Sequence, residues 1–428
     1  MAEKQNIPEI RFEGFTDPWE QRKLGEFSKK RTTKNADGTL SETFTNSAEQ
    51  GVISQLDYFD HDITNDANIS GYYVVQPDDF VYNPRISATA PCGPINRNRL
   101  DRAGVMSPLY TVFSVDASVD KTYLEHYFKT SRWHDFMFLE GNSGARSDRF
   151  SISDATFFEM PIWCPEISEQ KAMAKQLETT DHLITLHQRK YDKLCTVKKS
   201  MLDKMFPKPG ETEPEIRFEG FTDPWEQRKL GDCFEFLKNN TLSRADLNGE
   251  NGTARNVHYG DILIKFGDCL DGERSDLPFI TDDTVLPKFA GSILREGDVI
   301  FADTAEDEAA GKCVELRKLP KEPTLSGLHT IPVRPRFPFG TGYLGHYLNS
   351  DAYHRQLLPL MQGIKVISVS KAALQDTQVR FPSLSEQAAI GAALSEIDNL
   401  ITLHQRMGPI FCFCAHGSRT NFASTLQG

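Results

Sequence analysis

Eighteen consecutive residues of this chain occur twice without a single change. Residues 8–25 read PEIRFEGFTDPWEQRKLG, and residues 214–231 repeat the same letters. A shorter segment, LITLHQR, also occurs twice, at 183–189 and at 400–406. The residues between these matched segments differ almost completely. Repeats around a variable interior predict two modules in equivalent positions, each presenting its own surface.

The chain has 428 residues, which is enough for two or three domains. Its composition, 39% hydrophobic and 25% charged, is typical of a soluble globular protein. No apolar run approaches the roughly 20 residues that span a bilayer, and the first residues lack the apolar segment of a secretory signal. We therefore expect a cytoplasmic protein whose eight cysteines, none in a C-x-x-C pair, are free thiols.

The formal net charge of −12 argues mildly against a nucleic-acid-binding protein, for which a basic domain is usual. It does not exclude one, because phosphate contacts need only a local basic face. The charge alone leaves both classes open.

Both variable interiors are predicted to be mixed α/β with many short strands. In the first half, residues 71–85 read as strand, turn and strand, and residues 109–115 as another strand. In the second half, residues 259–267 read as a strand. Residues 121–138 carry apolar side chains at helical spacing, and residues 343–358 correspond to them.

Within the repeated eighteen residues, which we call the frame, the large apolar side chains are expected to fill a core. In the first copy these are Phe12, Phe15 and Trp19. Because the frame occurs twice, the same packing is expected in two equivalent cores.

The clearest helix of the chain spans residues 167 to about 206. Nine of its positions, spaced alternately three and four residues apart, form a predicted seam: Leu177, Thr180, Ile184, His187, Tyr191, Leu194, Lys198, Met201 and Met205. A second helix opens at Ser385-Glu386-Gln387, as the first opens at Ser168-Glu169-Gln170. Its seam lies 217 residues after the first four positions and consists of Leu394, Ile397, Ile401 and His404. We expect the two seams to pack together, with the coiled-coil interface formed by Leu177, Ile184, Tyr191, Leu194, Leu394, Ile397 and Ile401.

The second helix is predicted to break off after Arg406, because residues 407–428 follow no helical period. This tail contains Cys412, Cys414 and His416, but three candidate ligands at unusual spacing are a weak metal signal. We predict no metal site in the chain.

Catalytic motifs are missing from the sequence. There is no H-E-x-x-H, no G-x-S-x-G, and no glycine five residues before Gly311-Lys312 as a phosphate-binding loop requires. His187 and His404 lie on the helix seams, where packing is the expected role. The sequence therefore predicts a recognition subunit that is not an enzyme by itself.

This layout resembles the specificity subunit of type I restriction-modification systems. The resemblance rests on the two frames, the Ser-Glu-Gln helix starts, the duplicated LITLHQR and two interior segments, residues 79–85 and 259–263. It covers nearly all of residues 8–406. It implies an α+β fold with two target-recognition domains, separated by two long helices that pack as an antiparallel coiled coil.

The resemblance also implies a function. Each domain would read one half of a split site in double-stranded DNA, and the helices would fix their separation and dock methyltransferase subunits, with restriction subunits further out. S-adenosylmethionine, ATP and Mg²⁺ would be used by those partners, with no cofactor in this chain. The expected divisions are a first target-recognition domain, a first spacer helix with its linker, a second domain, a truncated second helix and a tail, at residues 1–165, 166–213, 214–383, 384–406 and 407–428.

Base reading in the major groove needs forked or bidentate donors, which Arg, Lys and Asn supply. The candidates in the first half are Asn83, Arg85, Arg97, Arg99, Arg146 and Arg149, and those in the second are Lys265, Arg274 and Lys365. Arg146 and Lys365 are favoured, because both lie on glycine loops just before a matched Ser-x-Ser. For every candidate, a solvated surface charge is the competing interpretation.

Two other functions remain open on the sequence. A scaffold that binds partner proteins through its helices suits the acidic charge, although a symmetric scaffold gains nothing from two different interiors. A transcription regulator with tandem DNA-binding modules is the other, but no compact helix-turn-helix is present to support it.

Overall fold

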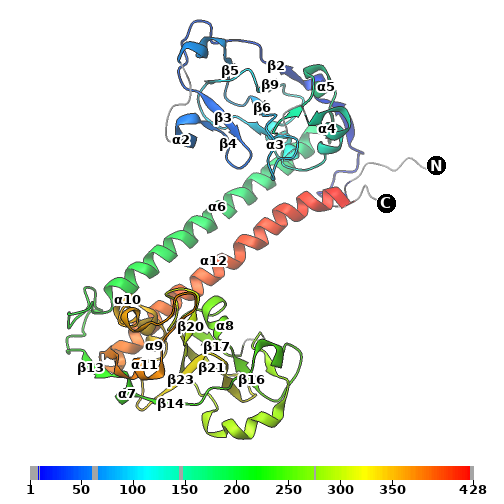
Figure 1. Ribbon diagram of the computed structural model, residues 1–428. Coiled ribbons are helices and arrows are strands. Elements are labelled where there is room, and N and C mark those ends of the chain that lie inside the picture. Colours follow the sequence, from blue (N-terminus) through cyan, green and yellow to red (C-terminus); the bar gives the residue numbers. More distant parts are fainter. Residues whose placement is uncertain (1–7, 9, 60–65, 144–147, 274–275, 425–428) are drawn as a thin grey trace. The chain divides into compact units, whose positions relative to one another are not determined.

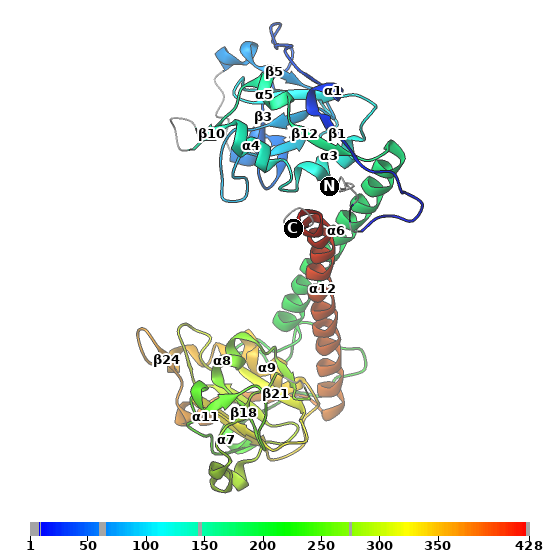
Figure 2. The same cartoon turned by 90° about the vertical axis from the view of Figure 1, so that its right-hand side faces the viewer.

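The computed structural model describes residues 8, 10–59, 66–143, 148–273 and 276–424. They form two compact units, one comprising residues 1–187 and 407–428 and the other residues 188–406. The division falls inside the two long helices, α6 (Ile167–Lys204) and α12 (Leu384–Ser424), which Figures 1 and 2 show as single continuous helices. None of the helices in the described ranges is long and apolar enough to cross a membrane.

The first unit is a mixed α/β module built on a four-stranded antiparallel sheet in the order β2-β9-β6-β7. Helix α3 packs on β7 of this sheet (Figure 1). Its remaining strands pair two by two, as β1-β12, β3-β4, β5-β8 and β10-β11. The strands are β1 (Glu20–Lys23), β2 (Ser28–Lys30), β3 (Phe44–Ser47), β4 (Gly51–Ser54), β5 (Tyr73–Val75), β6 (Phe80–Tyr82), β7 (Ile95–Arg97), β8 (Gly104–Met106), β9 (Thr111–Val115), β10 (Asn142–Ser143), β11 (Phe150–Ser151) and β12 (Pro161–Cys164). The helices before α6 are α1 (Leu24–Phe27), α2 (Gln55–Phe59), the 3₁₀ helix η1 (Asp66–Gly71), α3 (Lys121–Phe128), α4 (His134–Glu140) and α5 (Asp154–Phe158).

The second unit repeats this plan with additions. Its main sheet has the order β14-β23-β19-β21-β17, in which the first four strands correspond to β2-β9-β6-β7 and β17 is an added parallel edge strand. A second sheet, β15-β18-β16-β22, has only a partial counterpart in the described part of the first unit, where a parallel bridge from Thr43 to Val105 of β8 matches the parallel pair β16-β22. The strands are β13 (Glu226–Lys229), β14 (Phe234–Phe236), β15 (Leu247–Asn248), β16 (Arg255–Val257), β17 (Cys269–Asp271), β18 (Phe279–Ile280), β19 (Val299–Ala302), β20 (Thr304–Ala305), β21 (Cys313–Lys318), β22 (Thr324–Ser326), β23 (Thr330–Pro335), β24 (Ile367–Ser368) and β25 (Gln378–Phe381). The helices before α12 are α7 (Leu230–Cys233), η2 (Arg244–Asp246), α8 (Tyr259–Ile264), η3 (Asp283–Ser292), α9 (Tyr343–Asn349), α10 (Asp351–His354), η4 (Leu358–Leu360) and α11 (Lys371–Asp376).

The repeated sequence makes the same contacts in both units. Arg11 donates two hydrogen bonds to the carboxylate of Glu169, at 2.8 and 2.6 Å, and Arg217 donates two to Glu386, both at 2.7 Å. Both glutamate side chains are 1% exposed. The frame is therefore fastened by a buried bidentate ion pair to the first turn of each long helix, which explains the glutamate of the Ser-Glu-Gln starts.

The glutamines of the same starts are also buried and equivalently bonded. Gln170 Oε1 accepts from the backbone N–H of Asp120 at 2.9 Å, and Gln387 Oε1 accepts from that of Gly340 at 2.9 Å. These bonds hold the loop before α3 and α9, respectively. Each long helix is thus anchored both to the frame and to the interior of its own module.

The prediction for the frame's aromatic residues is only partly right. Trp19 is buried and packs edge-on against Tyr123, and Trp225 is buried against Tyr343. Phe12, in contrast, is 41% exposed. The tryptophan is the frame's buried aromatic residue, while Phe218 of the second frame packs against the core as a partly buried side chain.

Several sequence-predicted elements differ in the structure. Residues 259–267 were expected to be a strand, but α8 occupies this place, because the ring Nδ1 of His258 caps the helix by accepting from the N–H of Gly260 at 3.2 Å. Each predicted helix at 121–138 and 343–358 is divided, into α3 and α4 and into α9 and α10, respectively. The prediction that the second helix ends at 406 is wrong, since α12 runs to Ser424. Pro409 removes one backbone hydrogen bond, and the neighbouring residues retain helical geometry.

Candidate nucleic-acid interface

The predicted base-reading residues of the first module fall into two groups. Arg97 and Arg99 are held by acidic side chains. Arg97 donates to Asp78 and lies 3.8 Å from Glu125, and its side chain is 12% exposed. Arg99 donates to Glu125 at 2.8 Å and to Glu178 of α6 at 3.1 Å, and it stays half exposed. Burial raises the pKa of Asp78, but Arg97 and Lys121 outweigh it and lower that pKa.

Arg85 and Arg149 form the second group. Their backbones are paired in an antiparallel bridge, with the N–H of Ile86 bonded to the carbonyl of Asp148 at 3.0 Å and the N–H of Phe150 bonded to that of Pro84 at 2.8 Å. Neither guanidinium has an acidic partner within the described ranges. The two segments, more than 60 residues apart in the chain, thus bring two unpaired cations together at one place on the module.

The two other candidates of the first module lie near this bridge in the chain. Asn83 donates from Nδ2 to the carbonyl of Asn46 at 2.8 Å and accepts from the backbone of Arg85 at 3.0 Å, so its amide positions the arginine loop. Arg146 lies outside the described residues.

In the second module, Lys265 lies 3.1 Å from Asp261, which also receives two hydrogen bonds from Arg244 at 2.8 and 2.7 Å. Burial raises the pKa of Asp261, but these two cations lower it overall. Lys365 is exposed on the loop before β24 and has no ion pair among the described residues. Arg274 lies outside the described residues.

The predicted seam positions of the two long helices differ in exposure from the residues around them. Along α6 the seam positions from Leu177 to Met201 are half-buried, while most of the residues between them are exposed. On α12, Leu394 is buried, and Ile397 and Ile401 are half-buried. Within the second unit the two helix segments run antiparallel, because Lys198 pairs with Asp398 while Met205, later on α6, shares a core cluster with Ile390, earlier on α12.

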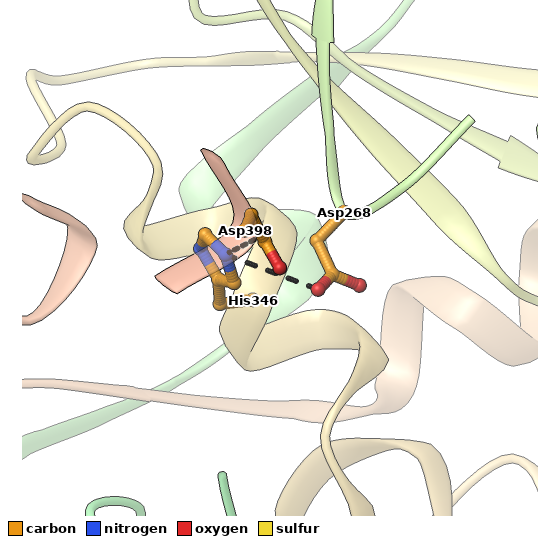
Figure 3. A group of neighbouring side chains, drawn as sticks. All are labelled: Asp268, His346 and Asp398. Atoms are coloured by element: carbon orange, nitrogen blue, oxygen red, sulfur yellow. Dashed lines mark hydrogen bonds and ion pairs between the residues drawn. The ribbon is translucent and has the colours of Figure 1, made fainter. Parts of the chain in front are cut away.

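A charged cluster joins these segments to the second module. Asp268, His346 and Asp398 converge from the loop before β17, from α9 and from α12 (Figure 3). The fully buried His346 ring lies with Nε2 2.8 Å from Asp398, and Lys198 Nζ lies 2.7 Å from Asp268 and 2.5 Å from Asp398. The carboxylates and the imidazole are ligand types that bind divalent metals, but the Lys198 ammonium already forms ion pairs with both carboxylates. The cluster is therefore an internal ion-pair network.

Burial and neighbouring charges act in opposite directions on the pKa values of Lys198 and Asp398. It lowers the pKa of Lys198, but the two aspartates outweigh it and raise that pKa. It raises the pKa of Asp398, but His346 and Lys198 outweigh it and lower that pKa. The only sign of this cluster in the sequence was Lys198, which occupies a seam position of α6 where an apolar residue is usual. Its acidic partner Asp268 could not be found from the spacing of residues.

The family model for the type I restriction modification DNA specificity domain matches residues 222–407. The frame and the helix start that bound this segment recur in the first unit with the same ion pairs. Residues 222–407 therefore form a DNA specificity domain of the type I restriction-modification kind. The resemblance inferred from the sequence is confirmed.

Individual proteins are similar to this chain. The specificity subunit of the type I restriction enzyme MjaVIII from Methanocaldococcus jannaschii is 24% identical over 267 residues. This match covers 60% of this chain and 59% of that protein, which is less than two thirds of its length. The S subunit of a type I restriction-modification system from M. genitalium has a similar fold, with a TM-score of 0.56 and 11% identity over 97% of this chain and 98% of that one. The HsdS subunit from Thermoanaerobacter tengcongensis aligns with a TM-score of 0.43 and 14% identity over 96% of this chain and 98% of that one.

The M. genitalium structure confirms the predicted α+β fold of two modules and two long helices for this chain.

Proposed function

We propose that this specificity subunit selects the DNA sequence on which a type I restriction-modification complex acts. Each module reads one half of a bipartite site in double-stranded DNA. The observation that carries the proposal is the pairing of an identical frame, bonded identically in both units, with interiors of different structure. A protein that presents two different surfaces in equivalent positions is built to read two different half-sites.

In this proposal, this chain recognises DNA and its partner subunits carry out the catalysis. Residues 1–165 and 214–383 read DNA, and α6 and α12 fix the spacing and dock methyltransferase and restriction subunits. The chain itself is non-catalytic, and S-adenosylmethionine, ATP and Mg²⁺ act in those subunits in the cytoplasm. The cations proposed to contact DNA first are Arg85, Arg149 and Lys365, which no acidic side chain of the described ranges neutralises, together with Arg146 and Arg274. The remaining candidates contact DNA only if they first release the hydrogen-bond or ion-pair partners described above. They are Asn83, Arg97, Arg99 and Lys265.

The experiment is to co-express the chain with its methyltransferase subunit and map methylated adenines in the host DNA. The expected result is one bipartite motif with a fixed gap. A matched culture that lacks this chain should show no such motif. A stable complex that methylates no specific sequence would contradict the proposal and favour a scaffold that reads no bases.

A further inference from the structure

A short hairpin projects from the second module between η4 and α11. Gln362 and Ser368 exchange two backbone hydrogen bonds, at 3.0 and 2.8 Å, and enclose five residues. The returning strand, β24, pairs with β20, and the N–H of Val369 bonds to the carbonyl of Asp303 at 2.8 Å. Ile367 packs against the main core. The base of the hairpin is therefore fixed to the module.

The tip of this hairpin is apolar and exposed. Ile364 is 98% exposed and Val366 is 56% exposed, with the exposed Lys365 between them. Leaving an isoleucine in water forgoes the favourable free energy of burying it. An apolar pair around a lysine is suited to a partner that offers both apolar groups and negative charge.

The tip is also held in one conformation. Gly363 has φ of +120°, and a Cβ atom at this position would lie 1.9 Å from the carbonyl oxygen of Val366. Only glycine fits here, so the chain reverses at a fixed point. A preformed tip loses little conformational freedom when it binds.

The first module carries a hairpin at the same place in its topology. Strands β10 and β11 pair just before α5, which Ser153 caps, as the second hairpin precedes α11, which Ser370 caps. That first hairpin leads into Arg149, which is paired with Arg85. The first hairpin has basic residues beside it, and the second has an apolar tip. These different surfaces are suited to contacts with different base pairs.

The major groove of B-DNA admits a two-stranded β-ribbon, and its only apolar group on the base edges is the thymine methyl. We propose that the hairpin of residues 362–368 enters the major groove of the second half-site and that Ile364 contacts a thymine methyl there. Lys365 then contributes a cation to a phosphate or a guanine. This inference rests on the proposed function, and it names the chemistry by which the second module reads one base pair.

The test combines a protein change with a DNA change. The complex with the methyltransferase subunit is prepared with the parent chain and with Ile364→Ala, and binding is measured on duplexes carrying the mapped site. Each thymine of the second half-site is replaced in turn by uracil, which lacks only the methyl. For the parent, we expect one replacement to weaken binding about fivefold. Ile364→Ala should bind the thymine duplex at least fivefold more weakly and show no further loss with uracil.

A control variant separates this contact from a general effect of losing an exposed isoleucine. Ile216→Ala removes an exposed isoleucine of the frame, which is identical in both halves and so reads no sequence. It should bind both duplexes as the parent does. Because Ile364 is almost fully exposed, its replacement should leave the thermal midpoint unchanged.

Two results would overturn the inference. If uracil weakens Ile364→Ala as much as the parent, or if no thymine replacement affects the parent, Ile364 does not read a thymine methyl, while the proposed function stands. If the parent complex itself does not prefer the mapped site over unrelated DNA, the proposed function fails, and this inference fails with it.

Discussion

Arginine side chains have two different uses in this protein. Arg11 and Arg217 each form an ion pair with a buried glutamate. Arg85 and Arg149, in contrast, have no carboxylate partner within the described ranges. A guanidinium already bound on two nitrogens to a carboxylate offers fewer donors to a base. The partner of each arginine therefore separates the structural arginines from the candidate readers.

Arg217→Met should strongly destabilise the second unit. It leaves the carboxylate of Glu386, 1% exposed, without its counter-charge, which costs about 3 kcal/mol. Urea unfolding measures the loss. Arg228→Met is the matched control, because its partner Glu226 is exposed and the pair contributes less than about 1 kcal/mol. If both variants lost the same free energy of unfolding, the buried ion pair of the frame would contribute no more to stability than the exposed pair.

Arg149→Ala should weaken binding of the assembled complex to its specific site by roughly fivefold to tenfold, through the loss of one base or phosphate contact. The thermal midpoint should stay unchanged. Arg97→Ala should do the reverse, because it removes one of the cations that pair with Asp78 and with the nearly buried Glu125. Fluorescence anisotropy and thermal unfolding measure the two effects. A lower thermal midpoint for Arg149→Ala, with unchanged affinity, would remove it from the interface.

At the scale of elements, each long helix joins parts of the molecule that are distant in sequence. The first turn of α6 receives Arg11 of the frame, and its last turns receive Asp268 of the second module through Lys198. A polar residue at a seam position favours one register of paired helices, because any other register would leave its charge unpaired. Lys198 is therefore placed to fix how α6 and α12 align within the second unit.

Lys198→Ala should lower stability by about 2 to 4 kcal/mol at pH 7, because two partly buried carboxylates lose their shared cation. Lys199→Ala, at an exposed position, is the control and should have little effect. Urea unfolding measures both. A similar small change in the two variants would contradict the assigned role.

The same cluster predicts how stability depends on pH. The pKa of Asp398 is lowered in the folded state, so its contribution is present above the unfolded pKa of about 4 and is lost as the pH falls further. The pKa of Lys198 is raised, so its contribution persists until the pH exceeds its ordinary value of about 10.5. Unfolding midpoints at pH 7 and pH 3.5 should therefore differ less in Lys198→Ala than in the parent. An identical difference would show that the cluster does not titrate with folding.

At the scale of the whole molecule, the two modules share the same frame contacts and differ in their interiors. The same ion pairs, at Glu169 and Glu386, join the frame to the helix in both units. The contacts that depend on the interior, such as the second sheet of the second unit, stay inside that unit. Because the frame contacts do not depend on the interior, the interior of one module should fold in the frame of the other.

Replacing residues 26–168 by residues 232–385 joins the second interior to the first frame between identical residues at both junctions. We expect a folded chain with two copies of the second module. With the methyltransferase subunit it should methylate a site made of two copies of the second half-site. Mapping of methylated adenines tests this, with the parent chain as control. A folded chimera that still methylates the parent site would contradict the division into reading modules.

The sequence by itself determined the duplication and the two long helices. These depend on identity and on a repeat of three and four residues, and both are local properties that a linear sequence displays directly. The family resemblance and the α+β class followed from them. Along α6 the positions from Leu177 to Met201 are half-buried at the predicted spacing.

Only the tertiary structure decided which charges are available to a partner. Arg97, Arg99 and Lys265 are as basic in sequence as Arg85 and Lys365, but the first three are paired with carboxylates. The partners of Arg97 and Arg99 lie 19 and 79 positions away, so no local pattern reports these two pairs. The exposure of Ile364 and the meeting of Lys198 with Asp268 were decided in the same way, because burial and ion pairing depend on contacts between segments that are separated in the sequence.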